Sequence, residues 1–144
     1  MNWQENILQT DAQIVELLKN TKTIVVLGIK IESFQPAFYV PKYMQQAGFQ
    51  IVPVPVYYPE IDKILGEKVY RKLIEIPHEI DLVNVFRGSN DVAEHTADIL
   101  AKKPKAVWLQ TGISNDQVAE TFAKEGIKVV QDSCLMVEHR ALIN

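Results

Sequence analysis

The residues best suited to bind a ligand lie just after the first apolar run of the sequence. The run at 23–27 ends at Gly28, and Pro36 stands where the first turn of a helix is expected. A helix start presents unpaired backbone N–H groups and about half a positive charge, so this loop is suited to hold a phosphate. Lys30 in this loop and Arg87 in a later one add positive charge. A turn glycine beside two solvated cations is the alternative, because the loop lacks the further glycines of a dinucleotide-binding motif.

Cys134 is the second candidate for chemistry. It is the only cysteine and directly precedes an expected helix, where the helix dipole favours a thiolate nucleophile. His139 follows at a spacing that does not predict a Cys–His pair, and packing as a small apolar side chain is the alternative role for this thiol. One cysteine and three histidines give no metal-ligand cluster. We therefore expect neither a metal site nor an independent catalytic activity.

Alternating apolar runs and helical segments must position these residues. Strands are predicted at 23–27, 50–54, 80–86, 106–109 and 127–130, and helices at 10–20, 36–46, 91–102, 114–125 and 134–142. This alternation predicts an α/β fold, a Rossmann-like three-layer sandwich with a five-stranded parallel sheet in the order 3-2-1-4-5. Ligands bind beyond the carboxyl ends of such strands, which here are the loops after Leu27, Val54 and Phe86.

Several boundaries rest on particular residues. Thr10 with Gln13, and Ser114 with Gln117, have the spacing of capping boxes that begin helices. Side chains at 89–91 offer acceptors for the start of another helix. Pro53 cannot donate to a strand ladder, so its strand is expected to end there or to lie at an edge of the sheet. The stretch 55–76 is expected to be irregular, with short extended or helical pieces.

Length and composition argue against several classes of protein. With 144 residues, 47% hydrophobic and 23% charged, the chain is expected to form one domain over 1–144, with 1–20 as an N-terminal helical extension. A net charge of −3 argues against nucleic acid as a partner, and no apolar stretch predicts a membrane span or secretory signal. The single cysteine favours a reducing, cytoplasmic location. A homodimer through an uncovered sheet edge or the N-terminal helices stays open.

Seven blocks along the chain, taken together, resemble a known family. The resemblance is to the small stand-alone CoA-binding domain proteins, which are related to the nucleotide-binding half of the succinyl-CoA synthetase α chain. It runs from about Lys22 to Leu142. The blocks are Gly28-Ile29, Gly48-Phe49 followed by Val52-Pro53-Val54, Leu65-Gly-Glu-Lys-Val-Tyr70, Ile76-Pro77, Asp81-Leu-Val-Asn-Val-Phe-Arg87, Val107-Trp-Leu-Gln-Thr-Gly112 and Asp132-Ser-Cys-Leu-Met-Val-Glu-His139.

The resemblance implies a Rossmann-like domain that binds coenzyme A or an acyl-CoA as a non-catalytic carrier or sensor. The diphosphate would rest on the loop 28–35 and the adenosine near 53–57. The cofactor-binding residues implied for this small-molecule nucleotide ligand are Gly28, Lys30, Gln35, Val54 and Arg87. A mixed disulfide between the CoA thiol and Cys134 is a further hypothesis.

Four positions depart from the pattern of the family. Lys30 and Ala37 replace serines, Gln35 replaces an arginine, and Pro55 replaces an asparagine. Loss of the arginine removes a bidentate phosphate fork that a lysine cannot reproduce, which predicts weakened or altered ligand preference. Two alternatives therefore stand beside CoA binding. The chain is a subunit of an acyl-CoA ligase-type complex, or it is a scaffold or interaction protein that has lost the nucleotide ligand.

Overall fold

A parallel five-stranded sheet forms the centre of the molecule in the computed structural model, which describes residues 2–143. Met1 and Asn144, the ends of the predicted 1–144 domain, lie outside the described residues. The strands of the sheet are β1 (Thr23–Leu27), β2 (Gln50–Val54), β5 (Leu82–Val85), β6 (Ala106–Leu109) and β7 (Lys128–Val130). A separate short hairpin consists of β3 (Lys63–Ile64) and β4 (Glu67–Lys68).

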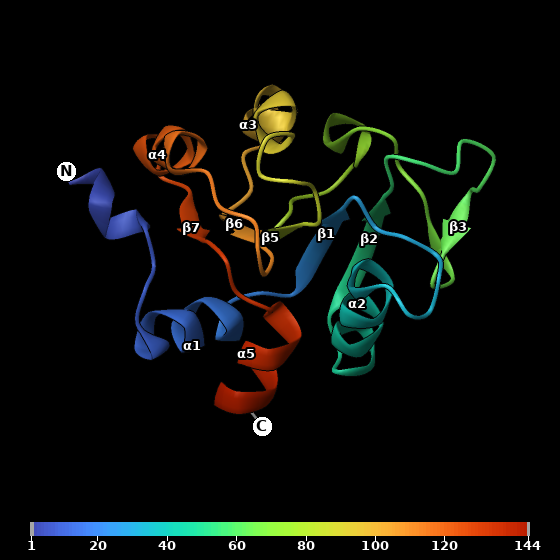
Figure 1. Cartoon of the computed structure of the whole chain (residues 1–144), viewed down its shortest axis with the longest axis horizontal. Helices are drawn as coiled ribbons and strands as arrows, with labels where there is room; N and C mark the ends of the chain where they lie inside the picture. The colour runs from blue at the N-terminus through green and yellow to red at the C-terminus, as the bar shows by residue number, and fades with distance from the viewer. Residues whose placement is uncertain (1, 144) are drawn as a thin grey trace.

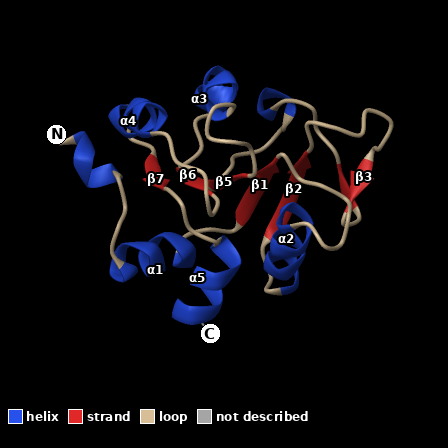
Figure 2. Cartoon of the chain, viewed as in Figure 1, coloured by secondary structure: helices blue, strands red, loops and turns tan. Residues whose placement is uncertain are grey.

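Helices cover both faces of this sheet. They are α1 (Asp11–Lys19), α2 (Pro36–Gln46), α3 (Thr96–Lys102), α4 (Asp116–Lys124) and α5 (Leu135–Leu142), with 3₁₀ turns η1 (Trp3–Asn6), η2 (Leu73–Glu75) and η3 (Val92–His95). Helices α1, α2 and α5 lie on one face, and α3 and α4 lie on the other (Figure 1). Figure 2 shows the resulting three layers by element type. The α/β, Rossmann-like three-layer class is therefore confirmed.

The place of the predicted third strand is corrected by the structure. β5 pairs with β1, with Leu27 opposite Val85, and does not lie outside β2. Counted along the chain, the sheet order β2-β1-β5-β6-β7 is 2-1-3-4-5. The β3–β4 hairpin stands beside β2, where the third strand of a 3-2-1-4-5 sheet would lie, and Tyr70 N–H donates to the Pro53 carbonyl there. The order of the sheet therefore reverses between β1 and β5.

Two hydrophobic cores, one on each face, explain why the strands carry so few polar residues. In β1, Val25 and Leu27 pack towards α3 and α4, while Ile24 and Val26 pack towards α1, α2 and α5. All five residues of β1 are buried, as expected for a strand covered on both faces.

Most predicted helix boundaries are confirmed, with two corrections. The Thr10–Gln13 capping box is present, and α2 runs from Pro36 to Gln46 as predicted. At the start of α4, however, the cap is Asn115, whose Oδ1 accepts from Val118 N–H at 3.1 Å, and not Ser114. The third helix begins later than predicted, because 92–95 form the 3₁₀ turn η3 and the Asp91 side chain makes no capping bond.

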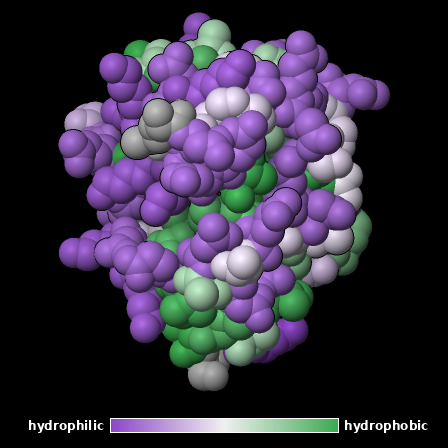
Figure 3. All heavy atoms as spheres, turned by 90° about the vertical axis from the view of Figure 1, so that its left-hand side faces the viewer, coloured by the Kyte–Doolittle hydropathy of each residue, from purple (hydrophilic) through white to green (hydrophobic). Residues whose placement is uncertain are grey.

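Both edges of the sheet have neighbours, which bears on the homodimer left open above. Leu8 N–H donates to the Val129 carbonyl beside β7, and the hairpin lies beside β2. Exposed apolar side chains include Val137 of α5 and Ile143 just after it. Figure 3 shows an apolar area at the lower end of the molecule, on a face that is otherwise largely hydrophilic. A homodimer stays a prediction.

Asp81 joins the starting ends of two central strands. Its Oδ2 accepts from the backbone N–H groups of Lys22 at 2.8 Å and Thr23 at 3.1 Å, and Lys105 Nζ lies 3.1 Å from Oδ1. Burial opposes ionisation of this carboxyl, but these donors together hold the pKa of Asp81 below its ordinary value. The ionised side chain therefore stabilises the folded chain.

Asp81→Ala is expected to lower the free energy of unfolding at pH 7 by about 1–3 kcal/mol, because two N–H groups lose their acceptor. The folded-state pKa is the lower one, so the ionic contribution is complete above the unfolded value of 3.8 and disappears as the pH falls through the folded value. Urea unfolding of both proteins at pH 7 and at pH 3 measures this difference. A variant as stable as the parent at pH 7, or a loss that does not shrink at pH 3, contradicts this role.

Candidate functional site

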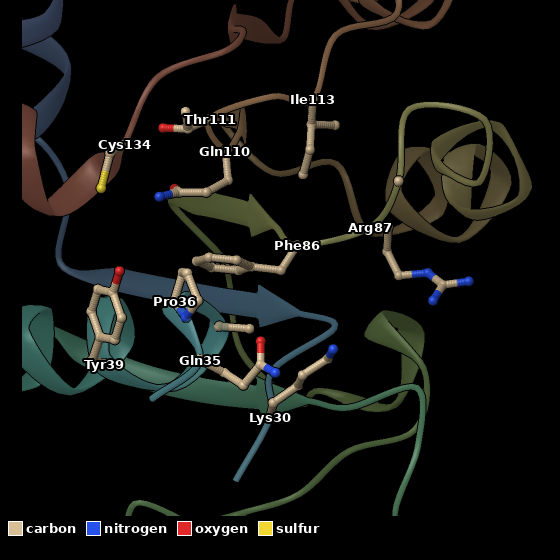
Figure 4. A pocket seen from close by; sticks show the side chains of 12 residues that line it. Lys30, Gln35, Pro36, Tyr39, Phe86, Arg87, Gln110, Thr111, Ile113 and Cys134 are labelled. Atoms are coloured by element: carbon tan, nitrogen blue, oxygen red, sulfur yellow. The ribbon is translucent and has the colours of Figure 1, made fainter. Parts of the chain in front are cut away.

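A pocket of about 560 Å³ opens beyond the carboxyl ends of β1, β5 and β6, next to the point where the strand order reverses. This is where open parallel sheets bind ligands, and the volume is typical of a small-molecule site. Its wall comes from the loop and first turns of α2, the loops after β5 and β6, and the start of α5 (Figure 4). The lining residues are Lys30, Gln35, Pro36, Ala37, Tyr39, Phe86, Arg87, Gly88, Gln110, Thr111, Ile113 and Cys134.

Three of the five predicted binding residues meet in this pocket. Lys30, Gln35 and Arg87 line it, although they are far apart in the sequence. Gly28 and Val54 are buried beneath it and do not belong to its lining. The Val54 carbonyl accepts from Gly28 N–H at 2.8 Å, so these two residues join β1 to β2 under the site.

Gly28 has a steric role that follows from the topology. Its φ is +86°, and a Cβ at this position would lie 2.5 Å from the carbonyl oxygen of Phe86, much closer than side-chain atoms approach a backbone oxygen. Phe86 N–H in turn donates to the Leu27 carbonyl at 2.8 Å. The absence of a side chain therefore lets the chain leaving β1 pass close to the chain leaving β5, which forms the floor of the pocket.

The backbone N–H groups of the loop 28–35 and of the start of α2 are only partly available to a ligand. Among the loop amides, Lys30 N–H donates to the Ala37 carbonyl and Gln35 N–H to the Glu32 carbonyl, in addition to the Gly28 bond to Val54. These bonds fold the loop back onto the start of α2. Ala37 N–H, in the first turn of α2, has no acceptor among the described residues and belongs to a residue that lines the pocket.

Polar side chains supply donors beside this helix start. Lys30 Nζ has no ion pair or hydrogen bond within the described part of the chain, and neither does the side-chain amide of Gln35, which precedes α2 without capping it. Figure 4 shows both groups at the mouth of the pocket, at the same end as Arg87. This end of the pocket therefore offers free hydrogen-bond donors that an anion could accept from.

Arg87 is positioned by partners on η3. Its Nη2 donates to Glu94 Oε1 at 2.9 Å, its Nε donates to His95 Nε2 at 3.2 Å, and Asp91 lies 4.0 Å away. Burial disfavours the charge, but hydrogen bonds to Glu94 and Tyr57 and the nearby carboxylates raise the pKa of Arg87 above its ordinary value. The guanidinium is thus fully charged, and the carboxylates of Glu94 and Asp91 offset part of that charge.

His95 accepts from Arg87, so it is neutral in this arrangement. Burial lowers the pKa of His95 below its ordinary 6.5, although Glu94 acts in the opposite direction. At neutral pH the ring nitrogen is therefore free to accept. Protonation in acid removes this acceptor and places a second cation beside Arg87.

Gln110 is a pocket residue that the sequence analysis did not select. Its side chain is 4% exposed, and its Oε1 accepts from Asn84 Nδ2 at 3.2 Å and from Leu135 N–H at 3.3 Å. Its amide nitrogen has no partner among residues 2–143, and Figure 4 shows it directed into the pocket. Its signals in the sequence were its position directly after the strand at 106–109 and its place in the block Val107–Gly112 of the family resemblance.

Cys134 lies at the opposite end of the pocket from the cations (Figure 4). It is the N-cap residue of α5, and its thiol is partly buried. His139 is bonded through Nδ1 to the Tyr43 hydroxyl at 2.9 Å and is enclosed between Tyr43 and Phe49. No Cys–His pair forms, as the spacing predicted.

Comparisons with known proteins show the family to which this chain belongs. Residues 22–140 match the sequence pattern of the family described as CoA binding domain. This chain belongs to the CoA-binding domain family. Uncharacterized protein YneT of Bacillus subtilis (strain 168) is 35% identical over 128 residues, which are 89% of this chain and 93% of that protein. Among solved structures, cell-free ID.343 from Thermus thermophilus has 34% identity and a TM-score of 0.86, covering 93% of this chain and 99% of that one.

A larger relative carries the same domain as a small part. Acetate–CoA ligase [ADP-forming] II of Archaeoglobus fulgidus (strain ATCC 49558) is 30% identical over 118 residues, which are 75% of this chain but 17% of the ligase. The family is therefore shared with the CoA-binding part of a ligase. In residues 2–143 no helix is long and apolar enough to cross a membrane, and no cluster of three or more His, Cys, Asp or Glu side chains is suited to hold a metal ion.

Proposed function

We propose that this member of the CoA-binding domain family binds coenzyme A or an acyl-CoA in the pocket beyond β1, β5 and β6, as a non-catalytic carrier or sensor. The observation that carries the proposal is the polarity of the pocket. Free cationic and amide donors stand at one end, an apolar surface with Phe86 spans the middle, and a thiol stands at the other end (Figure 4).

The order of these surfaces along the pocket matches the order of the chemical groups along CoA, from its phosphates to its thiol. The diphosphate is placed at Lys30, Gln35 and the start of α2, because charge-assisted bonds to phosphate are the strongest available there. We place the adenosine, with its 3′-phosphate, outside the pocket near Tyr57, an exposed ring that is close enough to Arg87 to affect its pKa. The pantetheine arm then crosses Phe86, and its amides reach Gln110.

A non-catalytic role is supported by where the histidines lie. None of the three lines the pocket: His78 is exposed, His139 is a buried residue of α5 bonded to Tyr43, and His95 is bonded to Arg87. A ligase reaction through a phosphorylated histidine would need one of them at the ligand. A cytoplasmic location is a further part of the proposal, supported by the single unpaired cysteine.

Calorimetric titration tests the proposal with four ligands: CoA, dephospho-CoA, NAD and ADP. We expect binding of CoA, weaker binding of dephospho-CoA because a phosphate is missing, and no preference for NAD. A preference for NAD contradicts the proposal and indicates an oxidoreductase relative. No heat with any of the four also contradicts it and favours a scaffold that has lost its ligand.

Glu94→Gln is expected to increase the affinity for CoA by up to about fivefold, because it releases Arg87 from a partly exposed ion pair worth about 1 kcal/mol or less. The matched control is Glu125→Gln, which removes the same charge at the exposed end of α4. Calorimetry of both variants measures the difference. Equal affinities in the two variants would show that Glu94 does not compete with the ligand for Arg87.

A subunit role in an acyl-CoA ligase-type complex is the second candidate, and the similarity to the acetate–CoA ligase favours it. This role predicts that the affinity-tagged chain, purified from its native host, retains a larger subunit in stoichiometric amount. It also predicts that the isolated chain with acetate, ATP and CoA forms no acetyl-CoA until that subunit is added. A chain that is purified alone from its host and still binds CoA argues for the carrier or sensor role.

A further inference from the structure

The segment that carries Cys134 is held in place from both sides. Before it, the Ser133 carbonyl accepts from Trp108 Nε1 at 2.8 Å. After it, Leu135 N–H donates to Gln110 Oε1. Trp108 belongs to β6 and is completely buried, so the cysteine is positioned by the central sheet and not by a free loop. Its side chain does not cap α5 and lines the pocket.

Gln110 is independent evidence that this end of the pocket receives a ligand. Gln110 is 96% removed from solvent, and the polar groups of a side chain buried to this degree are normally bonded within the protein. The amide nitrogen of Gln110 nevertheless lacks an acceptor in the described part of the chain and is directed into the pocket, on the side of Tyr39 and Cys134 (Figure 4). It is suited to donate to a carbonyl, such as the amide of a pantetheine arm.

We propose that Cys134 is a modification site that forms a mixed disulfide with the thiol end of a CoA held in this pocket. The inference rests on the proposed function, because it needs the diphosphate end of the ligand at Lys30. With that end fixed, the arm crosses Phe86 and brings its sulfur to the end of the pocket where Cys134 and the free amide of Gln110 lie. Binding thereby raises the local concentration of the ligand sulfur at the thiol.

The reaction is a thiol–disulfide exchange with a CoA disulfide as co-reactant. Cys134 loses its proton to solvent, and its sulfur attacks the nearer sulfur of the disulfide. A new bond joins Cys134 Sγ to one CoA, the original sulfur–sulfur bond breaks, and the second CoA leaves as a thiolate that takes up a proton. One disulfide is consumed and one is formed, so no other oxidant is needed. A dithiol such as dithiothreitol reverses the step.

Mass spectrometry of the intact, non-reduced protein tests the proposal. The reduced chain is incubated with CoA disulfide or with cystamine, a disulfide that lacks the nucleotide. We expect one CoA per chain on the peptide containing Cys134, removed by dithiothreitol and absent from Cys134→Ser. We also expect modification by CoA disulfide at least about tenfold faster than by cystamine. This expected difference between the two rates is a stringent test, because a chain of net charge −3 attracts the cationic cystamine more strongly than the anionic CoA disulfide.

Variants connect the rate to the pocket. Lys30→Glu should reduce the rate with CoA disulfide towards the cystamine rate without reducing the cystamine rate, which excludes a general loss of folding or of thiol reactivity. Equal rates for the two disulfides in the parent protein, or no adduct at all, overturn the proposal. Calorimetry of Cys134→Ser with CoA separates the two hypotheses. If this variant binds CoA while the parent is not modified, only the disulfide proposal fails, and if CoA does not bind, both fail.

Discussion

Replacing Lys30 and Arg87 together by glutamate is expected to abolish measurable binding of CoA. Each cation is expected to make charge-assisted hydrogen bonds to phosphate, worth about 1.5–3 kcal/mol each, and the reversed charges add repulsion. Loss of about 3 kcal/mol or more corresponds to a decrease in affinity of more than about 100-fold. Lys30→Glu alone should cost about 1–3 kcal/mol, and it avoids placing a carboxylate beside Glu94.

The matched control for this double variant is Lys19→Glu with Arg140→Glu. Both residues are exposed at the ends of helices, away from the pocket, and the change in net charge is the same. Calorimetry and circular dichroism of the two double variants measure affinity and folding separately. If the control loses as much affinity as the pocket variant, the effect is one of overall charge and the two cations do not define a phosphate site.

Gly28→Ala is expected to cause a large loss of stability. The positive φ alone costs a non-glycine residue about 1–3 kcal/mol, and the new methyl would also meet the Phe86 carbonyl at 2.5 Å. This carbonyl belongs to the backbone and cannot rotate away, so the ends of β1 and β5 must separate. The pocket floor moves with them, and CoA affinity should fall together with stability.

Gly48→Ala is a control that isolates the steric part of this effect. Gly48 has φ +104°, but among residues 2–143 no heavy atom beyond its two chain neighbours lies within 4 Å of the position of its missing Cβ. Urea unfolding should therefore show a smaller loss for Gly48→Ala, which carries the backbone strain without the clash. Equal losses for the two variants would show that the close approach of the strands at Gly28 has no energetic importance.

The sequence predicted those elements whose signals are local. β1 and α2 lie where they were predicted, because β-branched residues on both faces predict a buried strand and because proline is favoured in the first turn of a helix, where Pro36 lies. Lys30, Gln35 and Arg87 line one pocket, since loops at the carboxyl ends of neighbouring strands meet at one edge of the sheet. Whether these residues bind CoA stays a prediction.

The strand pairing and the hydrogen bonds within the loops were not predicted, because both depend on how the chain folds and not on a local residue pattern. The pairing of β5 with β1 and not with the outer edge of β2 depends on how the irregular stretch 55–76 crosses the sheet, which no residue pattern encodes. The use of Lys30 N–H by the Ala37 carbonyl, and of the Arg87 guanidinium by Glu94, depends on local folding of the loops. The orientation of the Gln110 amide towards the pocket depends on its bonds to Asn84 and Leu135, which no local pattern predicts.

Titration of ¹⁵N-labelled protein with CoA, followed by amide chemical shifts, tests the central claim most directly. If the ligand binds in the pocket beyond β1, β5 and β6, the largest shifts fall on 28–37, 53–57, 86–88, 110–113 and the start of α5, while the hairpin β3–β4 and α1 stay unchanged. Saturating CoA that produces no shifts, or shifts concentrated outside these five segments, contradicts the account.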